Sequence, residues 1–344
     1  MERQQEGRCE KLESFLRLLG NEIKDSDDAD EETYDLYAQD LPSSDLGIID
    51  PKTTELQLTV AGRELTIHQS PGILSSARAG GTTGAVTWRI TPLFATWISS
   101  ASNPLTNHLN LLNNPSSTII ELGAGTSAIV GLLLAPRVGR YVLTDQGYVA
   151  KLVERNITEN WASVSQQQQQ QTSSGGSKSR KGGPSKQKDK SGGGGAEAGG
   201  PGPGERLVFR ALDWETDTPT SSLAHPVSSS FDLVLACDCI YNEALVDPFV
   251  STCVDICKLR RHSDTTVAAG DKKRPAAVVV VAQVLRDSDV FNAWIKRFVQ
   301  DFRCWRVPDE MMIDELKSEG QGGSGGGGGT SGFVVHVGVL REGR

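Results

Sequence analysis

The chain alternates between short apolar runs and longer amphipathic stretches, and this alternation is the main clue to its fold. The strand-like runs are Thr118–Leu122, Tyr141–Thr144, Leu207–Leu212, Leu233–Cys237 and Ala276–Gln283. The last run is nearly all β-branched, as expected of a parallel strand that is buried on both faces. Helix-like patterns at Ser127–Leu134, Tyr148–Trp161 and Phe291–Phe302 stand among these strands. Strands that alternate with helices predict a three-layer α/β/α sandwich.

Two pairs of strand-like segments complete the predicted fold. Phe302–Val307 and Phe333–Leu340 should form an antiparallel hairpin at the end of the sheet, which brings the sheet to seven mostly parallel strands. Glu55–Gln69 alternates apolar and polar residues on both sides of Ala61-Gly62-Arg63, so we expect an N-terminal β-hairpin before the sheet. The expected fold class is therefore α/β, Rossmann-like.

Low-complexity segments limit the part of the chain that can fold. A segment at about 165–204 contains six consecutive glutamines and then little but Gly, Ser, Lys and Pro, and a second at about 320–332 is mainly glycine. Both lack residues to bury and are expected to be disordered inserts. We predict one domain at 55–344, preceded by a partly disordered extension at 1–54. The acidic stretch Glu22–Asp35 within it is expected to be solvated and flexible.

Composition excludes several classes of protein. The formal net charge of −8 argues against a nucleic-acid binder, which would carry a basic face, and suits a basic protein substrate. No apolar run is long enough to cross a membrane, and Met1–Phe15 lacks the apolar core of a signal peptide. We therefore expect a cytoplasmic protein, with a nuclear location left open. The six cysteines are expected to be packed thiols rather than disulfides or metal ligands.

The strongest candidate for chemistry is the turn after the first strand of the sheet. Gly123-Ala124-Gly125 follows Glu121 and Leu122, and the next strand ends at Asp145. Glycines allow a sharp turn and close approach of the backbone to a ligand, and a carboxylate at the next strand end can accept hydrogen bonds from ribose hydroxyls. The pattern also satisfies a permissive dinucleotide fingerprint, so an oxidoreductase that uses a nicotinamide cofactor is an alternative.

A second acidic block favours S-adenosylmethionine (AdoMet) over a dinucleotide. Leu233–Cys237 leads into Asp238-Cys239-Ile240-Tyr241. The sequence Asn or Asp, two prolines and an aromatic residue, which is usual at this place in enzymes that methylate amino groups of nucleic acids, is absent from the sequence. The expected partners therefore include neither a membrane nor sequence-specific nucleic acid.

Four blocks give the chain a resemblance to a known family. They are TGAVTWRITPLFATWI (Thr83–Ile98), ELGAGTSAIVGLLLA (Glu121–Ala135), ALDWE (Ala211–Glu215) and ACDCIYNEALVDPF (Ala236–Phe249). In content and order they resemble the seven-β-strand protein-lysine methyltransferases, in particular the fungal ribosomal lysine N-methyltransferase 5 group. The resemblance implies the class I AdoMet-dependent methyltransferase fold and covers roughly Leu56–Leu340.

The resemblance also implies roles for individual residues. Glu121, Gly123, Ala124, Gly125 and Asp145 would bind the methionine and ribose parts of AdoMet. Trp214 would stack beside the adenine with Asp213 near its amino group, the backbone at Ala236 would line the pocket, and Trp88 would close it. Asp238 would orient the ammonium of the target lysine by its charge, and Tyr241 would shape the lysine channel.

The function expected from these observations is AdoMet-dependent methylation of a protein lysine, with no metal. In the fungal group the substrate is a large-subunit ribosomal protein, so a ribosomal protein is the first expected substrate. An elongation factor or a chaperone would fit the same blocks. A scaffold that binds AdoMet without catalysis is the alternative outside the enzymes.

Overall fold

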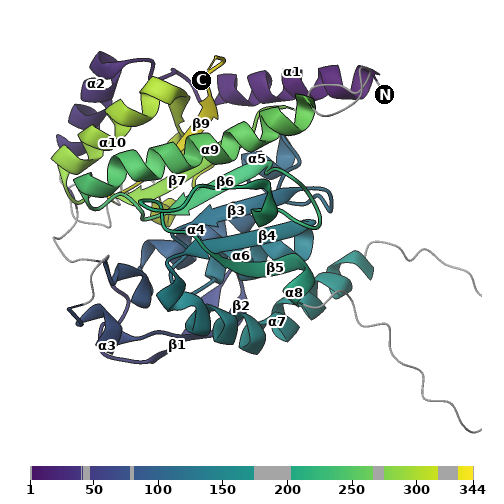
Figure 1. Ribbon diagram of the computed structural model, residues 1–344, viewed down its shortest axis with the longest axis vertical. Helices are drawn as coiled ribbons and strands as arrows, with labels where there is room; N and C mark the ends of the chain where they lie inside the picture. The colour runs from purple at the N-terminus through teal and green to yellow at the C-terminus, as the bar shows by residue number, and fades with distance from the viewer. Residues whose placement is uncertain are drawn as a thin grey trace, which may run out of the picture.

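A seven-stranded sheet forms the centre of the protein (Figure 1). The structure is a computed structural model that describes residues 2–39, 41, 47–77, 81–173, 203–265, 275–316 and 332–343. The strands of this sheet are β3 (Thr118–Leu122), β4 (Arg140–Asp145), β5 (Leu207–Ala211), β6 (Leu233–Cys237), β7 (Val278–Val284), β8 (Phe302–Arg306) and β9 (Phe333–Leu340). Their order is β5-β4-β3-β6-β7-β9-β8. The first five strands in this order run parallel, and β9 is antiparallel to both β7 and β8, which confirms the expected sheet and its final hairpin.

Strand order places the carboxyl ends of the two central strands side by side. From β3 the chain proceeds outward to β4 and β5 and then returns to β6 on the other side of β3. In open α/β sheets, ligands bind at the carboxyl edge where the order reverses in this way. The glycine turn follows β3 and the Asp238 loop follows β6, so the fold brings both to this place.

Helices cover both faces of the sheet. One face carries α1 (Glu2–Leu18), α4 (Ile90–Ser99), α6 (Ile129–Leu134) and α7 (Ala150–Ser173), and the other carries α2 (Ser26–Tyr37), α9 (Val246–Thr265) and α10 (Ser288–Asp301). Alternate residues of one strand supply the two cores, since Ile119 packs toward the first set and Ile120 toward the second. Short helices connect these elements: α3 (Pro71–Leu74), α5 (Pro104–Asn107), α8 (Pro203–Arg206), η1 (Thr83–Ala85), η2 (Ala135–Arg137), η3 (Gly147–Val149), η4 (Ser221–Leu223), η5 (Glu243–Leu245), η6 (Asp309–Met311) and η7 (Asp314–Leu316).

The predicted N-terminal hairpin is present as β1 (Glu55–Val60) and β2 (Arg63–His68). Ala61 and Gly62 connect the strands with φ angles of 50° and 72°, the left-handed conformation of a tight hairpin turn. Asn156 of α7 accepts the His68 backbone N–H at 2.7 Å and donates to the Thr126 carbonyl at 2.7 Å. This one amide therefore joins the hairpin to the segment that follows the glycine turn.

The acidic N-terminal stretch is ordered, contrary to the flexible segment expected from its charge. Asp25 caps α2 by accepting the backbone N–H groups of Asp27 and Asp28 at 3.0 and 3.1 Å. The helix buries Ala29 and Leu36 against the core. The expectation of flexibility was wrong because it weighed the acidic residues and overlooked the apolar positions spaced along one side of the helix.

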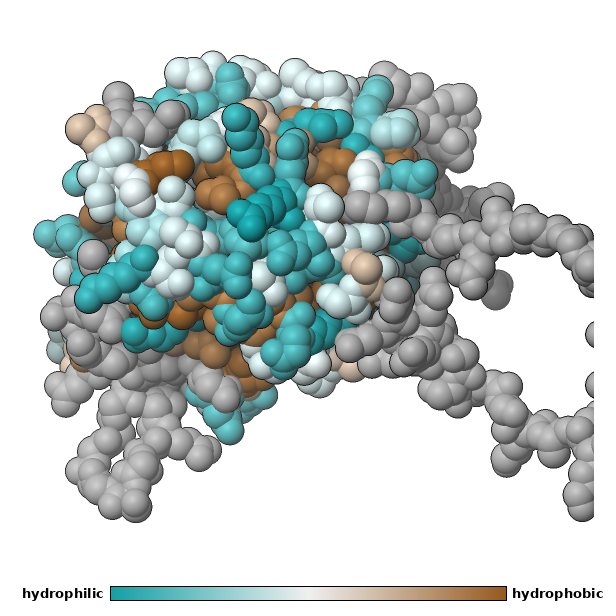
Figure 2. All heavy atoms as spheres, turned by 90° about the horizontal axis from the view of Figure 1, so that it is seen from below, coloured by the Kyte–Doolittle hydropathy of each residue, from teal (hydrophilic) through white to brown (hydrophobic). Residues whose placement is uncertain are grey.

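The remaining domain predictions fall mostly outside the described residues. The first insert, expected at about 165–204, begins as the end of α7, and residues 174–202 lie outside the described part; the second insert, apart from residue 332, also does. The boundary at residue 54 stays a prediction. On the face in Figure 2, which is the lower side of Figure 1, hydrophilic side chains dominate and apolar residues show only in separate areas.

Candidate functional site

A cavity of about 400 Å³ opens at the carboxyl ends of the central strands. This volume lies within the range of small-molecule sites. Of the eleven site residues predicted from the sequence, ten line the cavity: Trp88, Glu121, Gly123, Ala124, Gly125, Asp145, Asp213, Trp214, Asp238 and Tyr241. Ala236 is the exception. Ala236 is fully buried in the core beside α9 and α10, and the next residue, Cys237, lines the cavity instead.

The two glycines of the glycine turn sit where a side chain would be strained. Gly123 and Gly125 have φ angles of 64° and 60°, which residues with a Cβ rarely adopt. A Cβ on Gly123 would lie 2.6 Å from the Cys239 Sγ and 3.2 Å from the Trp214 ring. Both glycines are therefore required by the backbone conformation, and Gly123 also by its neighbours.

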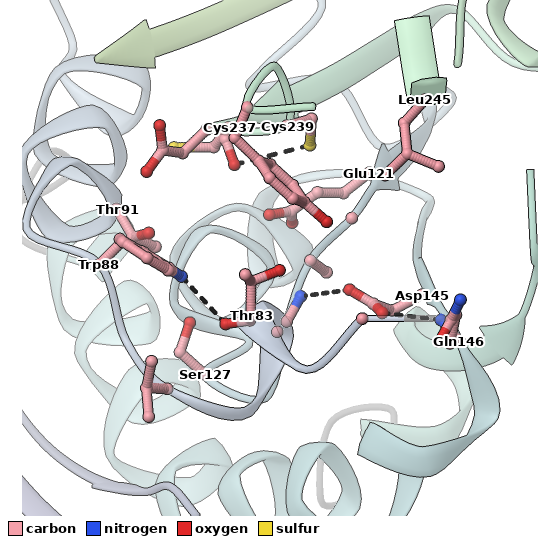
Figure 3. A pocket seen from close by; sticks show the side chains of 18 of the residues that line it. Thr83, Trp88, Thr91, Glu121, Ser127, Asp145, Gln146, Cys237, Cys239 and Leu245 are labelled. Atoms are coloured by element: carbon pink, nitrogen blue, oxygen red, sulfur yellow. Dashed lines mark hydrogen bonds between the residues drawn. The ribbon is translucent and has the colours of Figure 1, made fainter. Parts of the chain in front are cut away.

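Asp145 joins the end of β4 to the glycine turn. One carboxylate oxygen accepts the Gly125 backbone N–H at 2.9 Å, and the other accepts the backbone N–H of Gln146 at 2.7 Å, both drawn in Figure 3. Burial raises the pKa of Asp145 to about 6, although the two backbone N–H groups act to lower it. The side chain is thus fixed in orientation, and it is mainly ionised at neutral pH.

Glu121 is a second buried carboxyl at the floor of the cavity. Its side chain accepts the Tyr141 hydroxyl at 2.6 Å, and the residue is 3% exposed. Burial raises the pKa of Glu121 to about 8, and the nearby charge of Asp145 adds to this effect. Glu121 is therefore predominantly a neutral acid at pH 7, so the floor of the cavity carries less negative charge than the sequence suggests.

The predicted adenine end of the cavity is formed by Asp213 and Trp214. The Trp214 ring packs edge-on against Phe249 with 5.2 Å between ring centroids. Its Nε1 is buried and has no hydrogen-bond partner among the described residues. The Asp213 carboxylate accepts the Gln146 side-chain amide at 3.1 Å. An aromatic ring, a buried N–H group and a carboxylate therefore occur together on this side.

Trp88 lies on the opposite side of the cavity. Figure 3 shows Trp88 and Thr91 facing Asp145 and Gln146 across the pocket, with Cys237 and Cys239 at its upper side. The Trp88 Nε1 donates to the Thr83 carbonyl at 3.1 Å, which fixes the ring. The residue also pairs with Ile48 through a β-bridge, so the N-terminal extension contributes a wall of the cavity that the sequence analysis did not predict.

Asp238 is paired with an arginine. Its two carboxylate oxygens accept the Arg286 guanidinium at 2.6 and 2.7 Å, and its side chain is 3% exposed. The backbone of Asp238 has a φ of 61° and donates its N–H to the Ala282 carbonyl at 2.7 Å. Both oxygens of this carboxylate therefore already accept hydrogen bonds from a cation in this structure.

Tyr241 stands at the entrance of the cavity. The residue is 40% exposed; burial raises the pKa of its hydroxyl, and the Thr83 side chain acts to lower it. It is thus the one predicted site residue that reaches from the cavity to the protein surface through an exposed aromatic ring.

Several lining residues were missed in the sequence analysis. Gln146 directly follows β4 and Arg286 lies two residues after β7, so position near a carboxyl strand end was the available signal. Gly84 had no such signal: its carbonyl accepts the Thr126 N–H at 2.8 Å, and a Cβ on Gly125 would lie 3.2 Å from that carbonyl oxygen. Only the fold brings these two segments together.

The thiols at the cavity are neutral packing groups. Burial raises the pKa of Cys237 and of Cys239 well above the usual value. The Cys239 Sγ contacts the Leu122 carbonyl at 3.3 Å. Within the described part of the chain, no group of three or more His, Cys, Asp or Glu side chains is arranged to hold a metal ion. No helix in that part has the length and hydrophobicity needed to cross a membrane.

The chain is similar to known proteins at the levels of family, sequence and structure. A family model described as lysine methyltransferase matches residues 68–177 and 197–284, more than half of the chain. A ribosomal lysine N-methyltransferase 5 of Saccharomyces cerevisiae is 30% identical over 74% of this chain and 76% of its own length. A diaminohydroxyphosphoribosylamino-pyrimidine deaminase of Schizosaccharomyces pombe is 26% identical over 79% of this chain. The chain spans only 51% of that relative.

Among solved structures, the chain is similar to a tRNA (uracil-54, C5)-methyltransferase of Pyrococcus abyssi in complex with S-adenosyl-L-homocysteine. The sequence identity is 12% and the TM-score is 0.36, with 84% of this chain and 45% of the other covered.

Proposed function

Since the chain belongs to the lysine methyltransferase family, we propose that it is an AdoMet-dependent protein-lysine N-methyltransferase. One observation carries the proposal: a single cavity holds the glycine turn with Asp145 on one side and the Asp238–Tyr241 loop beside it. In this proposal, the site for the nucleoside part of AdoMet and the path for a lysine side chain from the surface share this cavity.

The residues present fit AdoMet. The missing Cβ atoms of Gly123 and Gly125 leave backbone exposed to a ligand, and the Asp145 carboxylate can accept hydrogen bonds from ribose hydroxyls. Trp214 offers a ring face, and its buried Nε1 lacks a partner among the described residues. These features support Asp145 as the ribose-binding residue, with Asp213 and Trp214 at the adenine.

The reaction requires the lysine to lose its proton before it attacks. When bound, AdoMet would supply an electrophilic methyl group: the N–C bond would form from the lone pair of the neutral amine as the C–S bond breaks with its electron pair going to sulfur, and the one proton lost from the lysine before attack would pass to solvent. A free lysine has a pKa of about 10.4, so removing its proton at neutral pH costs about 4 to 5 kcal/mol. The enzyme must therefore favour the neutral amine.

The chain's own residues would position the amine and exclude water. Tyr241 and Trp88 form aromatic walls of the channel, and desolvation between them favours an uncharged amine. Asp238 would accept a hydrogen bond from the amine through Oδ2, which among the described residues accepts only Arg286, whereas Oδ1 accepts both Arg286 and the Val284 backbone N–H; a carboxylate has about four acceptor positions.

The protein substrate is proposed to be a large-subunit ribosomal protein. The relatives whose names include ribosomal lysine N-methyltransferase support this choice. We propose a cytoplasmic location on the same ground, since ribosomal proteins are made there.

The test is transfer of a labelled methyl group from AdoMet to the proteins of an extract that lacks the endogenous enzyme. Mass spectrometry should find the label on a lysine of one large-subunit ribosomal protein. The Asp238→Ala enzyme should lose about 100-fold or more of the activity. The Tyr241→Phe enzyme should lose about tenfold, which corresponds to one hydrogen bond.

Tyr34→Phe is the matched control, since Tyr34 is 73% exposed on α2 and is not part of the cavity lining. Its activity should equal that of the wild type, and all enzymes should bind AdoMet in calorimetry. Label on an elongation factor or a chaperone would keep the enzyme class and contradict the ribosomal substrate. AdoMet binding without label on any protein would contradict the proposal.

A further inference from the structure

The ion pair between Asp238 and Arg286 crosses from one strand end to the next. Asp238 follows β6 and Arg286 follows β7, and the two contacts of 2.6 and 2.7 Å form a bidentate pair. Both residues line the cavity, and Arg286 lies beyond the residues that the family model matches, 68–177 and 197–284. Such two-pronged geometry is specific to arginine and holds the carboxylate in one orientation.

The guanidinium is held on its other sides as well. Its central carbon lies 5.1 Å from the centroid of the Trp88 ring, a distance at which a cation is attracted to the ring face. A Cβ on Gly47 would lie 3.5 Å from an Arg286 nitrogen, so the N-terminal extension passes close to this side chain. The Arg286 side chain is therefore held in place as part of the cavity wall.

The charge of Asp238 alone would oppose the reaction. A carboxylate within about 4–6 Å favours the charged form of an amine and raises the pKa of that amine by about 1–3 units. An ammonium held in this way has no lone pair for attack. A cation bound to the same carboxylate offsets its charge and leaves its remaining lone pairs able to accept a hydrogen bond.

We propose that Arg286 is a positioning residue that offsets the charge of Asp238, so that the target lysine is held in the cavity as a neutral amine. The proposal rests on the proposed function and assigns this site a further residue. Asp238 then serves as a hydrogen-bond acceptor of fixed orientation, and it does not act as a counter-ion that retains the ammonium.

Other titratable groups also face this pair. On the Asp238 side they are the neutral thiols of its flanking residues and the phenol of Tyr241. On the Arg286 side, the Tyr37 hydroxyl of α2 donates to the carbonyl of Asp287, the neighbouring residue, at 3.0 Å. The buried carboxyls of the cavity complete the set. The groups are Cys237, Cys239, Tyr241, Tyr37, Asp287, Glu121 and Asp145.

The experiment measures kcat against pH for the wild type and for Arg286→Gln, with the ribosomal protein labelled in the extract experiment as substrate. The pH dependence of kcat reports the pKa of the amine in the enzyme–substrate complex, whereas the pH dependence of kcat/KM reports the pKa values of the free enzyme and substrate. The apparent pKa in the kcat profile should rise by at least about one unit in Arg286→Gln, with about a tenfold loss of kcat at pH 7.5. AdoMet affinity should stay within about threefold.

Three further variants separate charge from structure. Arg286→Lys keeps the positive charge, so its kcat profile should keep the wild-type pKa. The double variant Asp238→Asn, Arg286→Gln removes both charges and should also return the pKa to the wild-type value. Arg297→Gln removes an arginine of α10 that pairs with Asp247 and Asp301 away from the cavity, and its profile should match that of the wild type.

The results that would contradict this inference differ from the result that would contradict the proposed function. If kcat of Arg286→Gln falls equally at all pH values, with an unshifted pKa, Arg286 has only a structural role and the inference is wrong. The same holds if the double variant keeps the raised pKa. If the wild type transfers no methyl group to protein while it binds AdoMet, the proposed function itself fails.

Discussion

The Asp145 carboxylate accepts the backbone N–H of Gly125 at 2.9 Å, across 20 residues of sequence. This contact fixes the glycine turn after β3 to the end of the neighbouring strand β4. Gly125 adopts a φ of 60°, a left-handed conformation that glycine tolerates best. The shape of the cavity thus depends on the conformation of the glycine turn, and substitution there tests this dependence.

Gly123→Ala should destabilise the protein and weaken AdoMet binding. The new Cβ would meet the Cys239 Sγ at 2.6 Å and the Trp214 ring at 3.2 Å, in addition to the strain of a φ of 64°. Overpacking costs about 1–3 kcal/mol and the left-handed backbone about 1–2 kcal/mol. Urea unfolding should show a loss of about 2–5 kcal/mol, which is the sum of these ranges, and calorimetry at least a tenfold weaker affinity for AdoMet.

Gly62→Ala provides the matched control for this substitution. Gly62 has a φ of 72° in the β1–β2 turn, and a Cβ there meets nothing within 4 Å. The free energy of unfolding of Gly62→Ala should fall only by the cost of the left-handed backbone, about 1–2 kcal/mol, and its AdoMet affinity should stay unchanged. Equal losses in the two variants would mean that packing around Gly123 has no effect.

Glu121→Gln should change how stability depends on pH. The pKa of Glu121 is about 8 in the folded protein, against 4.5 for the ordinary group. Between these values the folded state keeps a proton that the unfolded state has lost, so the free energy of unfolding falls as pH rises. Without ligand, the free energy of unfolding of Glu121→Gln should rise relative to that of the wild type by about 1.4 kcal/mol per pH unit between pH 5 and 8.

The measurement is urea unfolding of both proteins across this range. Above about pH 8, where both states of the wild type are ionised, the difference should be constant. A difference that does not vary from pH 5 to 8 would show that Glu121 is already ionised at neutral pH.

Glu32→Gln should loosen the attachment of α2. Glu32 accepts the side chain of the fully buried His336 at 2.9 Å, and Arg306 lies 3.6 Å from its carboxylate. Burial raises the pKa of Glu32, but its contacts with His336 and Arg306 outweigh this effect and leave the pKa below the usual 4.5. The variant should lose about 1–3 kcal/mol at pH 7.

This loss should itself depend on pH. Because the pKa of Glu32 is lowered in the folded state, its contribution is present above the unfolded pKa and disappears as pH falls through the folded pKa. The difference between the proteins should therefore narrow below about pH 4.5. Glu31→Gln, at the exposed neighbouring position, should show neither effect. A loss in Glu31→Gln as large as in Glu32→Gln would point to the charge of the helix rather than to the buried contact.

Local sequence determined the elements and most of the cavity. The apolar runs gave β3 and β6 with the observed bounds, because strands buried on both faces have few other patterns. The glycines and Asp145 could be found because a sharp turn and a strand-end carboxylate depend on residue types near each other in the chain. Ala236 does not line the cavity, because its side chain belongs to the core beside α9 and α10, and the role of its backbone stays a prediction.

Tertiary structure alone decided the charge and the boundaries of the site. Asp238 and Arg286 are 48 residues apart, and they meet because β6 and β7 are neighbours in the sheet. Ile48 reaches the cavity through its bridge to Trp88, and α2 is ordered by apolar positions that find a core only in the fold. A sequence states which residues can be charged, but the partner and the burial that fix their ionisation come from segments that the chain brings together when it folds.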